Sequence, residues 1–255
     1  MSTSVLKIGG STLEKLSDTF YQGIVNRVEK GDNVIIVHGG GPAINHQLEA
    51  LAIKSEFCEG LRKTTTDVLT IVEQVLSGQT NKEIVRKLKL AGAEAVGISG
   101  CDGSTLIAKE IDVHKWGYVG NVTTVSTKLL DLLLTNQMIP VVAPVAMNQL
   151  GQPLNVNADA AASAIAAAVS AEEFVFVTDV DGVFHNGKKL DQIYSKQAEQ
   201  LIADGVISGG MIPKVKGALA SLTSSLNKVR IVNGNAPYDE RSGTIIMTQV
   251  KAIIS

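Results

Sequence analysis

Residues 33–42 have the sequence NVIIVHGGGP, in which Asn33–Val37, a nearly continuous apolar run rich in β-branched residues, predicts a strand buried on both faces of a parallel sheet. Pro42 fits the first turn of a helix, so the glycines before it predict a tight strand-to-helix turn. A similar run, Val5–Ile8, leads into Gly9-Gly10. Ligands of open α/β sheets bind beyond the carboxyl ends of the strands, where glycine lets backbone N–H groups approach an anion. The two glycine loops therefore predict a phosphate or carboxylate site.

The rest of the chain continues this alternation. Four further apolar runs predict strands, at Ala95–Ile98, Ile139–Pro144, Phe174–Thr178 and Lys228–Val232. Apolar periodicity predicts helices at Asp18–Glu29, Ala43–Leu51, Thr66–Leu90, Lys128–Asn136, Asp159–Ser170, Ser195–Ala203 and Pro213–Leu226. The pattern predicts an α/β fold with a mostly parallel sheet. Two segments, Leu106–Ser126 and Val183–Ile193, predict hairpins, and a loop at 151–155 predicts a division into two lobes.

Composition excludes several functional classes. The 255 residues carry a net charge of -2 at pH 7, with 45% hydrophobic and 19% charged residues, which excludes intrinsic disorder. A pI of about 6.1 gives no electrostatic footprint for nucleic acid or an anionic membrane. No apolar stretch is long enough to span a bilayer. Cys58 and Cys101 are too few for a disulfide framework and predict reduced thiols in a cytoplasmic protein.

Three polar motifs follow predicted strands or open predicted helices. In residues 155–159, NVNAD, Asn157 fits a helix N-cap, and capping alone explains this motif as well as ligand binding does. Residues 178–183, TDVDGV, place two acids at the end of a buried strand. Gly209-Gly210 opens a helix whose first turn contains Lys214, a charge that the helix dipole disfavours. An anionic ligand is the simplest explanation for that lysine.

Competing motifs fit less well. Residues 182–189 have P-loop spacing but lack the hydroxyl that holds Mg²⁺, and Asn186-Gly187 predicts a hairpin turn instead. His-Gly-Gly-Gly at 38–41 resembles an esterase oxyanion loop, but residues 97–101, GISGC, do not complete a serine nucleophile elbow. A serine hydrolase stays as the alternative from another enzyme class. His38 is better interpreted as packing or hydrogen bonding beneath its loop than as a catalytic group.

Together, the motifs KIGG (7–10), HGGGP (38–42), GLRKT (60–64), NVNAD (155–159) and GGMIPK (209–214) resemble the amino acid kinase family over essentially the whole chain. The resemblance implies a three-layer αβα sandwich with a mostly parallel central sheet and one domain, 1–255. Its lobes would be 1–154, which binds the acceptor and dimerises, and 155–255, which binds ATP. Residues 60–62 and 155–159 are similar to members that phosphorylate the side-chain carboxylate of N-acetyl-L-glutamate in arginine biosynthesis.

The resemblance also implies residue roles. Lys7 and Lys214 would stabilise the transferring phosphoryl group, with Asp159 holding both lysines. Gly9, Gly10 and Gly40 would direct N–H groups at the phosphates, and the acceptor would contact Gly40, Gly41, Arg62 and Asn155. ATP would lie against Gly9, Gly10, Asp179, Val180, Asp181, Gly182, Val183, Phe184, Val206, Ile207, Ser208 and Lys214. Its Mg²⁺ would be held mainly by the phosphates, and residues 114–118 would form a lid over the acceptor.

Several alternatives and partners follow from the same resemblance. A kinase of a carrier-linked aminoadipate or glutamate has similar motifs and stays open, whereas a regulatory nucleotide-binding module would not need both lysines. The family's pairing through the first lobe implies a homodimer. Arginine-inhibited members carry an extra N-terminal helix, and only four residues precede the strand expected at Val5, so we expect a dimer that arginine does not inhibit.

Overall fold

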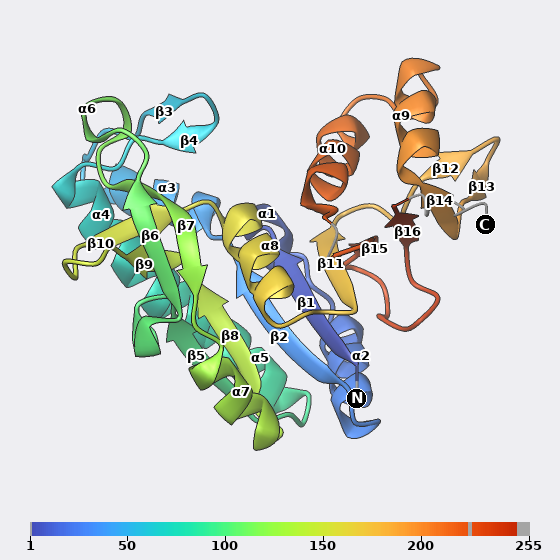
Figure 1. Ribbon diagram of the computed structural model, residues 1–255, viewed down its shortest axis with the longest axis horizontal. Helices are drawn as coiled ribbons and strands as arrows, with labels where there is room; N and C mark the ends of the chain where they lie inside the picture. Colours follow the sequence, from blue (N-terminus) through green and yellow to red (C-terminus); the bar gives the residue numbers. More distant parts are fainter. Residues whose placement is uncertain (1, 224–225, 249–255) are drawn as a thin grey trace, which may run out of the picture.

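The computed structural model describes residues 2–223 and 226–248, and its centre is one eight-stranded sheet (Figure 1). The strand order is β14-β16-β15-β11-β1-β2-β8-β5, and every neighbouring pair is parallel except β15 and β16. The strands are β1 (Thr3–Ile8), β2 (Asn33–His38), β5 (Ala95–Ser99), β8 (Ile139–Ala143), β11 (Glu173–Thr178), β14 (Gln192–Tyr194), β15 (Lys228–Asn233) and β16 (Thr244–Met247). The expected mostly parallel sheet is confirmed.

Helices cover both faces of this sheet, which makes the fold a three-layer αβα sandwich as expected. Alternate residues of β1 enter different cores: Val5 packs on one face, and Leu6 and Ile8 pack on the other. One face is covered by α2 (Asp18–Glu29) and α5 (Asn81–Leu90). The opposite face is covered by α7 (Lys128–Thr135), α8 (Ala158–Ala168), α9 (Ser195–Ala203) and α10 (Met211–Ser221). Parallel strands with β-branched residues on both faces need exactly such two-sided cover.

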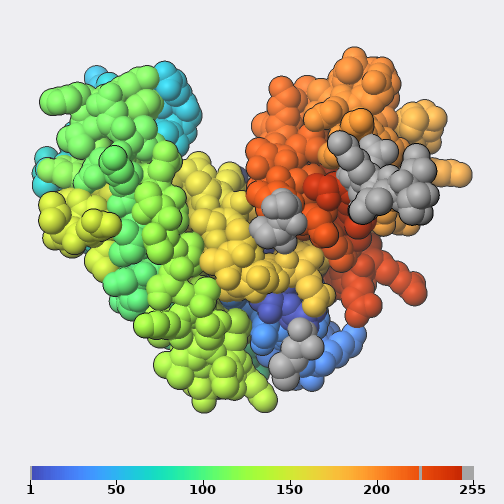
Figure 2. All heavy atoms as spheres, viewed as in Figure 1, coloured from blue at the N-terminus to red at the C-terminus, as the bar shows by residue number. Residues whose placement is uncertain are grey.

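Smaller elements extend from the sandwich. Strands β6 (Leu106–Glu110), β7 (Val119–Val125), β9 (Val145–Met147) and β10 (Pro153–Val156) form a second, closed sheet. The short α6 (Val113–Trp116) connects β6 to β7 and lies beside the hairpin of β3 (Phe57–Cys58) and β4 (Leu61–Arg62) in Figure 1. Strands β12 (Phe184–His185) and β13 (Lys188–Lys189) form the hairpin predicted around Asn186-Gly187. Figure 2 shows the molecule hollowed between the parts that carry α6 and α9.

Two helix predictions need correction. The helix predicted over Thr66–Leu90 is divided into α4 (Thr66–Glu73), a π-helix (Gln74–Thr80) and α5. Apolar periodicity does not distinguish the wider π-helical turn from an α-helical one. The helix predicted over Pro213–Leu226 begins earlier, at Met211, and ends at Ser221, whereas residues 224–225 lie outside the described part. Within the described residues, no helix is long and apolar enough to cross a bilayer.

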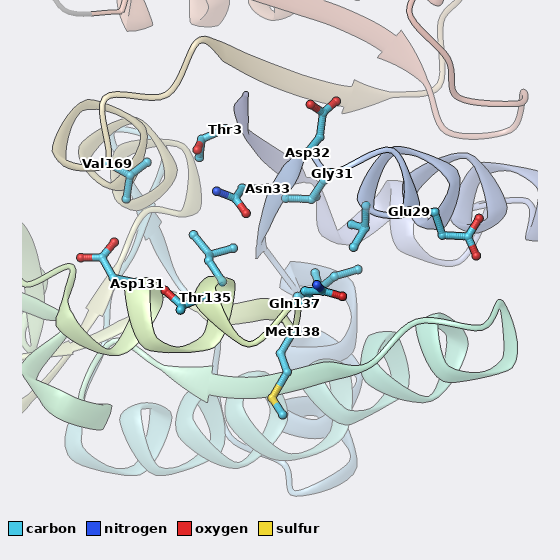
Figure 3. Close-up of a pocket in the computed structure, with 14 residues that line it drawn as sticks. Thr3, Glu29, Gly31, Asp32, Asn33, Asp131, Thr135, Gln137, Met138 and Val169 are labelled. Atoms are coloured by element: carbon cyan, nitrogen blue, oxygen red, sulfur yellow. The ribbon is translucent and has the colours of Figure 1, made fainter. Parts of the chain in front are cut away.

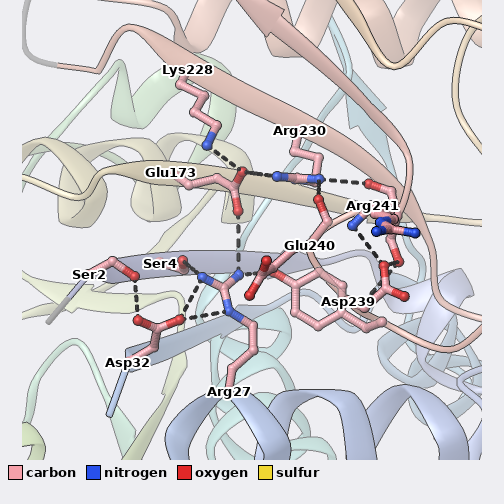
Figure 4. Close-up of polar contacts among 12 residues, drawn as sticks. Ser2, Ser4, Arg27, Asp32, Glu173, Lys228, Arg230, Asp239, Glu240 and Arg241 are labelled. Atoms are coloured by element: carbon pink, nitrogen blue, oxygen red, sulfur yellow. Dashed lines mark hydrogen bonds and ion pairs between the residues drawn. The ribbon is translucent and has the colours of Figure 1, made fainter. Parts of the chain in front are cut away.

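A buried charge cluster joins α2 to the sheet at the amino ends of its strands (Figure 4). Glu173, whose side chain is 5% exposed, lies 2.8 Å from Arg230, 3.3 Å from Lys228 and 3.4 Å from Arg27. Arg27 also donates to the Tyr238 hydroxyl at 2.6 Å. Burial opposes ionisation of Glu173, but the three cations outweigh it and hold the pKa of this carboxyl below its ordinary value. The cluster stabilises the amino ends of the strands, whereas the glycine loops follow their carboxyl ends.

Candidate active site

The two glycine loops touch because β1 and β2 are parallel neighbours, with Ile8 paired to His38. Gly10 opens α1 (Gly10–Leu13), with Gly9 as its N-cap, and Gly40 is the N-cap of α3 (Gly41–Ala50). A Cβ atom on Gly10 would lie 2.8 Å from the nitrogen of Gly41 and 2.9 Å from that of Gly40. No side chain fits at Gly10, so its glycine follows from the contact between the loops and not only from a tight turn.

Lys7 and Asp159 meet beside these loops. The Nζ atom of Lys7, near the end of β1, lies 2.7 Å from Oδ1 of Asp159 in the first turn of α8. Asn157 caps this helix, accepting from the N–H groups of Asp159 (2.9 Å) and Ala160 (3.1 Å). The Oδ1 atom is itself buried but accepts no well-directed hydrogen bond, so its contact with Lys7 is an ion pair. Capping and the lysine contact together fix the direction of the carboxylate.

Lys214 lies in the first turn of α10 and pairs with Asp179, which directly follows β11. The hydrogen bond from Lys214 lowers the pKa of Asp179 below its ordinary value, against a smaller opposing effect of burial. Within the described residues no ion pair joins Lys214 to Asp159. In this structure each lysine has its own carboxylate, and the expectation that Asp159 holds both lysines stays a prediction.

A pocket of about 420 Å³ opens next to Lys214. Its lining unites two chain segments: Asp179, Val180, Asp181, Gly182, Val183 and Phe184 follow β11, whereas Val206, Ile207 and Ser208 precede α10, together with Met211. The first nine are among the twelve residues that the family resemblance assigns to the nucleotide, and the structure brings these nine together in one pocket. Met211 was not expected, although it directly follows the Gly209-Gly210 pair that carried the motif.

Arg62 in β4 has neutral partners only. Its guanidinium donates to Ser55 Oγ, to Asn45 Oδ1 at 2.6 Å and weakly to the Gly41 carbonyl at 3.4 Å. It also lies 4.6 Å from the centre of the Phe57 ring. Arg62 is 7% exposed, and burial lowers its pKa below the ordinary value. Within the described part of the chain, no carboxylate lies within 4.0 Å of this guanidinium, although a buried charge normally has a partner.

Thr64 connects Arg62 to the expected lid and is itself bonded to Asn155 in β10. The Nδ2 atom of Asn155 donates to Thr64 Oγ1 at 3.0 Å, and this hydroxyl donates to the Arg62 carbonyl at 2.9 Å. Thr64 also bonds through its backbone to Trp116 and Tyr118, both at 2.8 Å. The 114–118 segment is therefore fastened to the arginine strand. Thr64 was missed by the sequence analysis, although it ends the GLRKT motif.

The structure gives little support to a serine hydrolase or to a metal site in the described residues. The Ser99 hydroxyl donates to Asp102 at 2.9 Å, and within the described residues no histidine contacts it, so the nucleophile–base pair of a serine hydrolase is missing there. In the same residues no three His, Cys, Asp or Glu side chains group as metal ligands. Cys58 and Cys101 are free thiols.

A second pocket, of about 460 Å³, lies at the end of the sheet where the strands begin, away from the glycine loops (Figure 3). It is lined by residues at the amino ends of the strands, such as Thr3 of β1, Asn33 of β2 and Ile139 of β8, with Asp131 and Val169 from the helices. Substrate sites of α/β sheets form at the carboxyl ends. This pocket therefore belongs to a different face of the molecule from the glycine loops.

Comparisons with known proteins agree with this architecture. The amino acid kinase family model matches residues 2–233. A protein of Shouchella clausii named acetylglutamate kinase is 51% identical over 255 residues, which cover 100% of this chain and 99% of that protein. A protein of the same name from Geobacillus thermodenitrificans is 49% identical over 256 residues, covering 99% of each.

Solved structures share the fold. A protein of Streptococcus mutans UA159 superposes with a TM-score of 0.82 at 33% identity, covering 96% of this chain and 98% of that chain. Carbamate kinase from Giardia lamblia superposes with a TM-score of 0.66 at 16% identity, covering 97% of this chain and 99% of that chain. With a family match across most of its length and relatives at about half identity, this chain belongs to the amino acid kinase family.

Proposed function

We propose that this chain transfers the γ-phosphoryl group of ATP to the side-chain carboxylate of N-acetyl-L-glutamate. The products are N-acetyl-L-glutamyl 5-phosphate and ADP, in an early step of arginine biosynthesis. Relatives that match over their full lengths are named acetylglutamate kinase. The acceptor binds the lobe 1–154 and ATP binds the lobe 155–255, with the glycine loops between them.

The observation that carries the acceptor assignment is the Arg62 guanidinium. It is almost fully buried, contacts only neutral groups and donates toward the loop that follows β2. A carboxylate of acetylglutamate supplies the missing negative charge in a bidentate contact that suits guanidinium better than ammonium. Asn155, tied to the same strand through Thr64, binds the substituents at the acceptor's α-carbon.

The nucleotide assignment rests on the pocket between the end of β11 and the start of α10. Val180, Val183 and Ile207 provide apolar surface for a base and sugar, whereas Lys214 and the Gly9-Gly10 amides lie where the phosphates would extend toward the acceptor. As the family resemblance implies, Mg²⁺ would be held mainly by the phosphates of ATP. When bound, the ion neutralises negative charge on them.

The chain's own residues neutralise charge rather than move a proton. A glutamate side-chain carboxylate has a pKa of about 4.3 and is ionised at pH 7, so the nucleophile needs no general base. Its oxygen forms a bond to the γ-phosphorus while the bond from that phosphorus to the bridging oxygen breaks, and ADP leaves with the electron pair. Lys7, Lys214 and the N–H groups of Gly10 and Gly40 stabilise the charge on the transferring group. Asp159 and Asp179 orient the lysines.

We further propose that the protein works in the cytoplasm as a homodimer paired through the lobe 1–154. The dimer is what the resemblance to the family implies, and the free thiols of Cys58 and Cys101 fit a reducing compartment. Light scattering on the purified chain tests the dimer. A monomeric mass at working concentration would contradict it.

The activity is tested by ADP release with ATP, Mg²⁺ and N-acetyl-L-glutamate, compared with free glutamate and aspartate. Hydroxylamine traps the acyl phosphate as a hydroxamate and identifies the phosphorylated group. We expect ADP release and hydroxamate with acetylglutamate alone. Activity only with a carrier-linked aminoadipate or glutamate would replace the proposed acceptor, and no acceptor-dependent ADP release would refute the proposal.

A further inference from the structure

His38 lies at the end of β2, directly before the glycine loop, and is 0% exposed. Its Nδ1 atom is 3.0 Å from the Gly39 carbonyl oxygen, and its Nε2 atom is 3.2 Å from Nδ2 of Asn81, the first residue of α5. A carbonyl oxygen only accepts, so the contact with Gly39 requires a proton on Nδ1. The question is what fixes the imidazole in that tautomer.

The surroundings of Asn81 answer it. Its Nδ2 atom has two hydrogens: one is donated to the Val141 carbonyl at 2.8 Å, and the other is shared between the Ile98 carbonyl at 3.3 Å and Nε2 of His38, whereas its Oδ1 atom accepts from Lys82 Nζ at 3.1 Å. Two carbonyls and an ammonium thus allow only one orientation of the amide. Nδ2 faces His38, so Nε2 accepts and Nδ1 carries the proton. Burial and the nearby Lys82 charge agree, because they lower the pKa of His38 to about 4 and keep the ring neutral.

The Nδ1–H group determines how the next peptide is turned. The peptide between Gly39 and Gly40 is trans, since the described chain contains no cis bonds. Its C=O and N–H therefore point in opposite directions. Because the Gly39 carbonyl is held toward the buried ring, the Gly40 N–H points away from it. Within the described residues, this N–H donates to no protein acceptor.

The π-helix holds the same glycine from another side. A Cβ atom on Gly40 would lie 2.5 Å from Leu76 Cδ2 and 3.4 Å from Thr80 Oγ1, both in the π-helix. Leu76 and Thr80 of the π-helix lie against the loop, and Asn81, which directly follows it, contacts His38. π-Helical turns are often found at functional sites. Gly97 of β5 leaves room for the amide, because a Cβ there would lie 1.8 Å from Asn81 Oδ1.

We infer that His38 and Asn81 are positioning residues that orient the Gly40 N–H toward the phosphoryl group while it is transferred. The inference rests on the proposed function, in which the Gly40 amide stabilises the transition state. Lys82, Asn81 and His38 form a chain of hydrogen bonds from the surface of α5 to the Gly39 carbonyl. The chain acts on phosphoryl transfer through the peptide, without touching substrate.

Two substitutions at His38 separate the two ring nitrogens. Asparagine places an amide nitrogen close to the position of Nδ1 and keeps a donor for Gly39, whereas glutamine reaches the position of Nε2 and keeps only the contact with Asn81. Because an oxyanion donor is worth about 100–1000-fold in kcat, we expect its misorientation in H38Q to lower kcat about 10–100-fold. The KM values for both substrates should change by less than about threefold, since ground-state contacts persist. H38N should recover most of kcat.

Thermal unfolding of each variant controls for folding, and His46→Asn, at an exposed position on α3, is the matched control. If H38Q is unfolded, Asn81→Asp is measured instead. An aspartate there accepts from Nε2–H, and deprotonation of the ring then leaves Nδ1 without its proton. The kcat of this variant, relative to wild type, should therefore fall as the pH rises from 6 to 8, with Lys82 the other charge facing the ring.

The outcomes are distinguishable. Wild type without acetylglutamate-dependent ADP release would overturn the proposed function itself. An active wild type, with H38Q at full kcat or with H38N and H38Q equally impaired, would overturn the inference alone. For Asn81→Asp, a ratio to wild type that is constant with pH would do the same. A selective loss of kcat in H38Q, with recovery in H38N, supports it.

Discussion

Replacing Gly10 by alanine tests the contact between the two glycine loops. Gly10 has no positive φ, so alanine can adopt its backbone conformation without strain. The added Cβ would lie 2.8 Å from the nitrogen of Gly41 and 2.9 Å from the nitrogen and Cα of Gly40. All three atoms are backbone, so a whole loop has to move rather than the tip of a side chain.

The size of the effect follows from that displacement. Ordinary contact begins near 3.4 Å, so the loops must separate by about 0.5 Å. Overpacking of this kind costs about 1–3 kcal/mol of the free energy of unfolding. A misplacement of catalytic groups by about 1 Å lowers the rate about 100-fold. If the logarithm of kcat falls in proportion to the displacement, a loop separation of about 0.5 Å should lower kcat about tenfold. Both effects are expected in Gly10→Ala.

The assay measures kcat and KM from ADP release and the free energy of unfolding from urea titrations. Gly78→Ala is the matched control, because a Cβ at this exposed position in the π-helix meets nothing within 4 Å. It should leave both quantities near wild type. A Gly10→Ala enzyme with wild-type kcat and unchanged unfolding would refute the steric reasoning, because the loops would then have room that the structure denies them.

Three further perturbations test the lysines, the arginine and the charge cluster. Lys7→Ala and Lys214→Ala should each lower kcat about 100–1000-fold with a smaller change in the KM for acetylglutamate, and steady-state kinetics with near-normal kcat would exclude their transition-state role. Arg62→Lys keeps the positive charge but loses the bidentate hydrogen bonding of the guanidinium. The KM for acetylglutamate should therefore rise about tenfold or more, while the KM for ATP stays constant in the same assay. Glu173→Gln leaves three cations without their carboxylate and should cost about 3–5 kcal/mol at pH 7 in urea unfolding. Because the folded-state pKa of Glu173 lies below its ordinary value of 4.5, this stabilisation is present above about pH 4.5 and is lost as the pH falls through the folded-state pKa. Wild type and Glu173→Gln should therefore converge in acid, and a difference that is independent of pH would contradict the assigned charge.

Much of the fold could be predicted from short stretches of the sequence. The runs at Val5–Ile8 and Asn33–Val37 are strands that are buried on both faces, and the glycines after them open helices, because strand burial and turn geometry depend on neighbouring residues. The π-helix at Gln74–Thr80 could not be read this way. Its residues keep a helical apolar pattern, so the wider turn does not show in the sequence, although Leu76 and Thr80 lie directly against Gly40 in the structure.

The sequence by itself determined the alternating strands and helices, the glycine loops and the two segments that line the pocket beside Lys214, since each is a contiguous motif with its own backbone requirements. Only the tertiary structure decided which charges meet. Lys214 pairs with Asp179, Arg62 is buried among neutral groups, and the amide of Asn81 lies 3.2 Å from Nε2 of His38. Such contacts join residues far apart in the chain, and their partners are selected by strand order and helix packing, which no local pattern encodes.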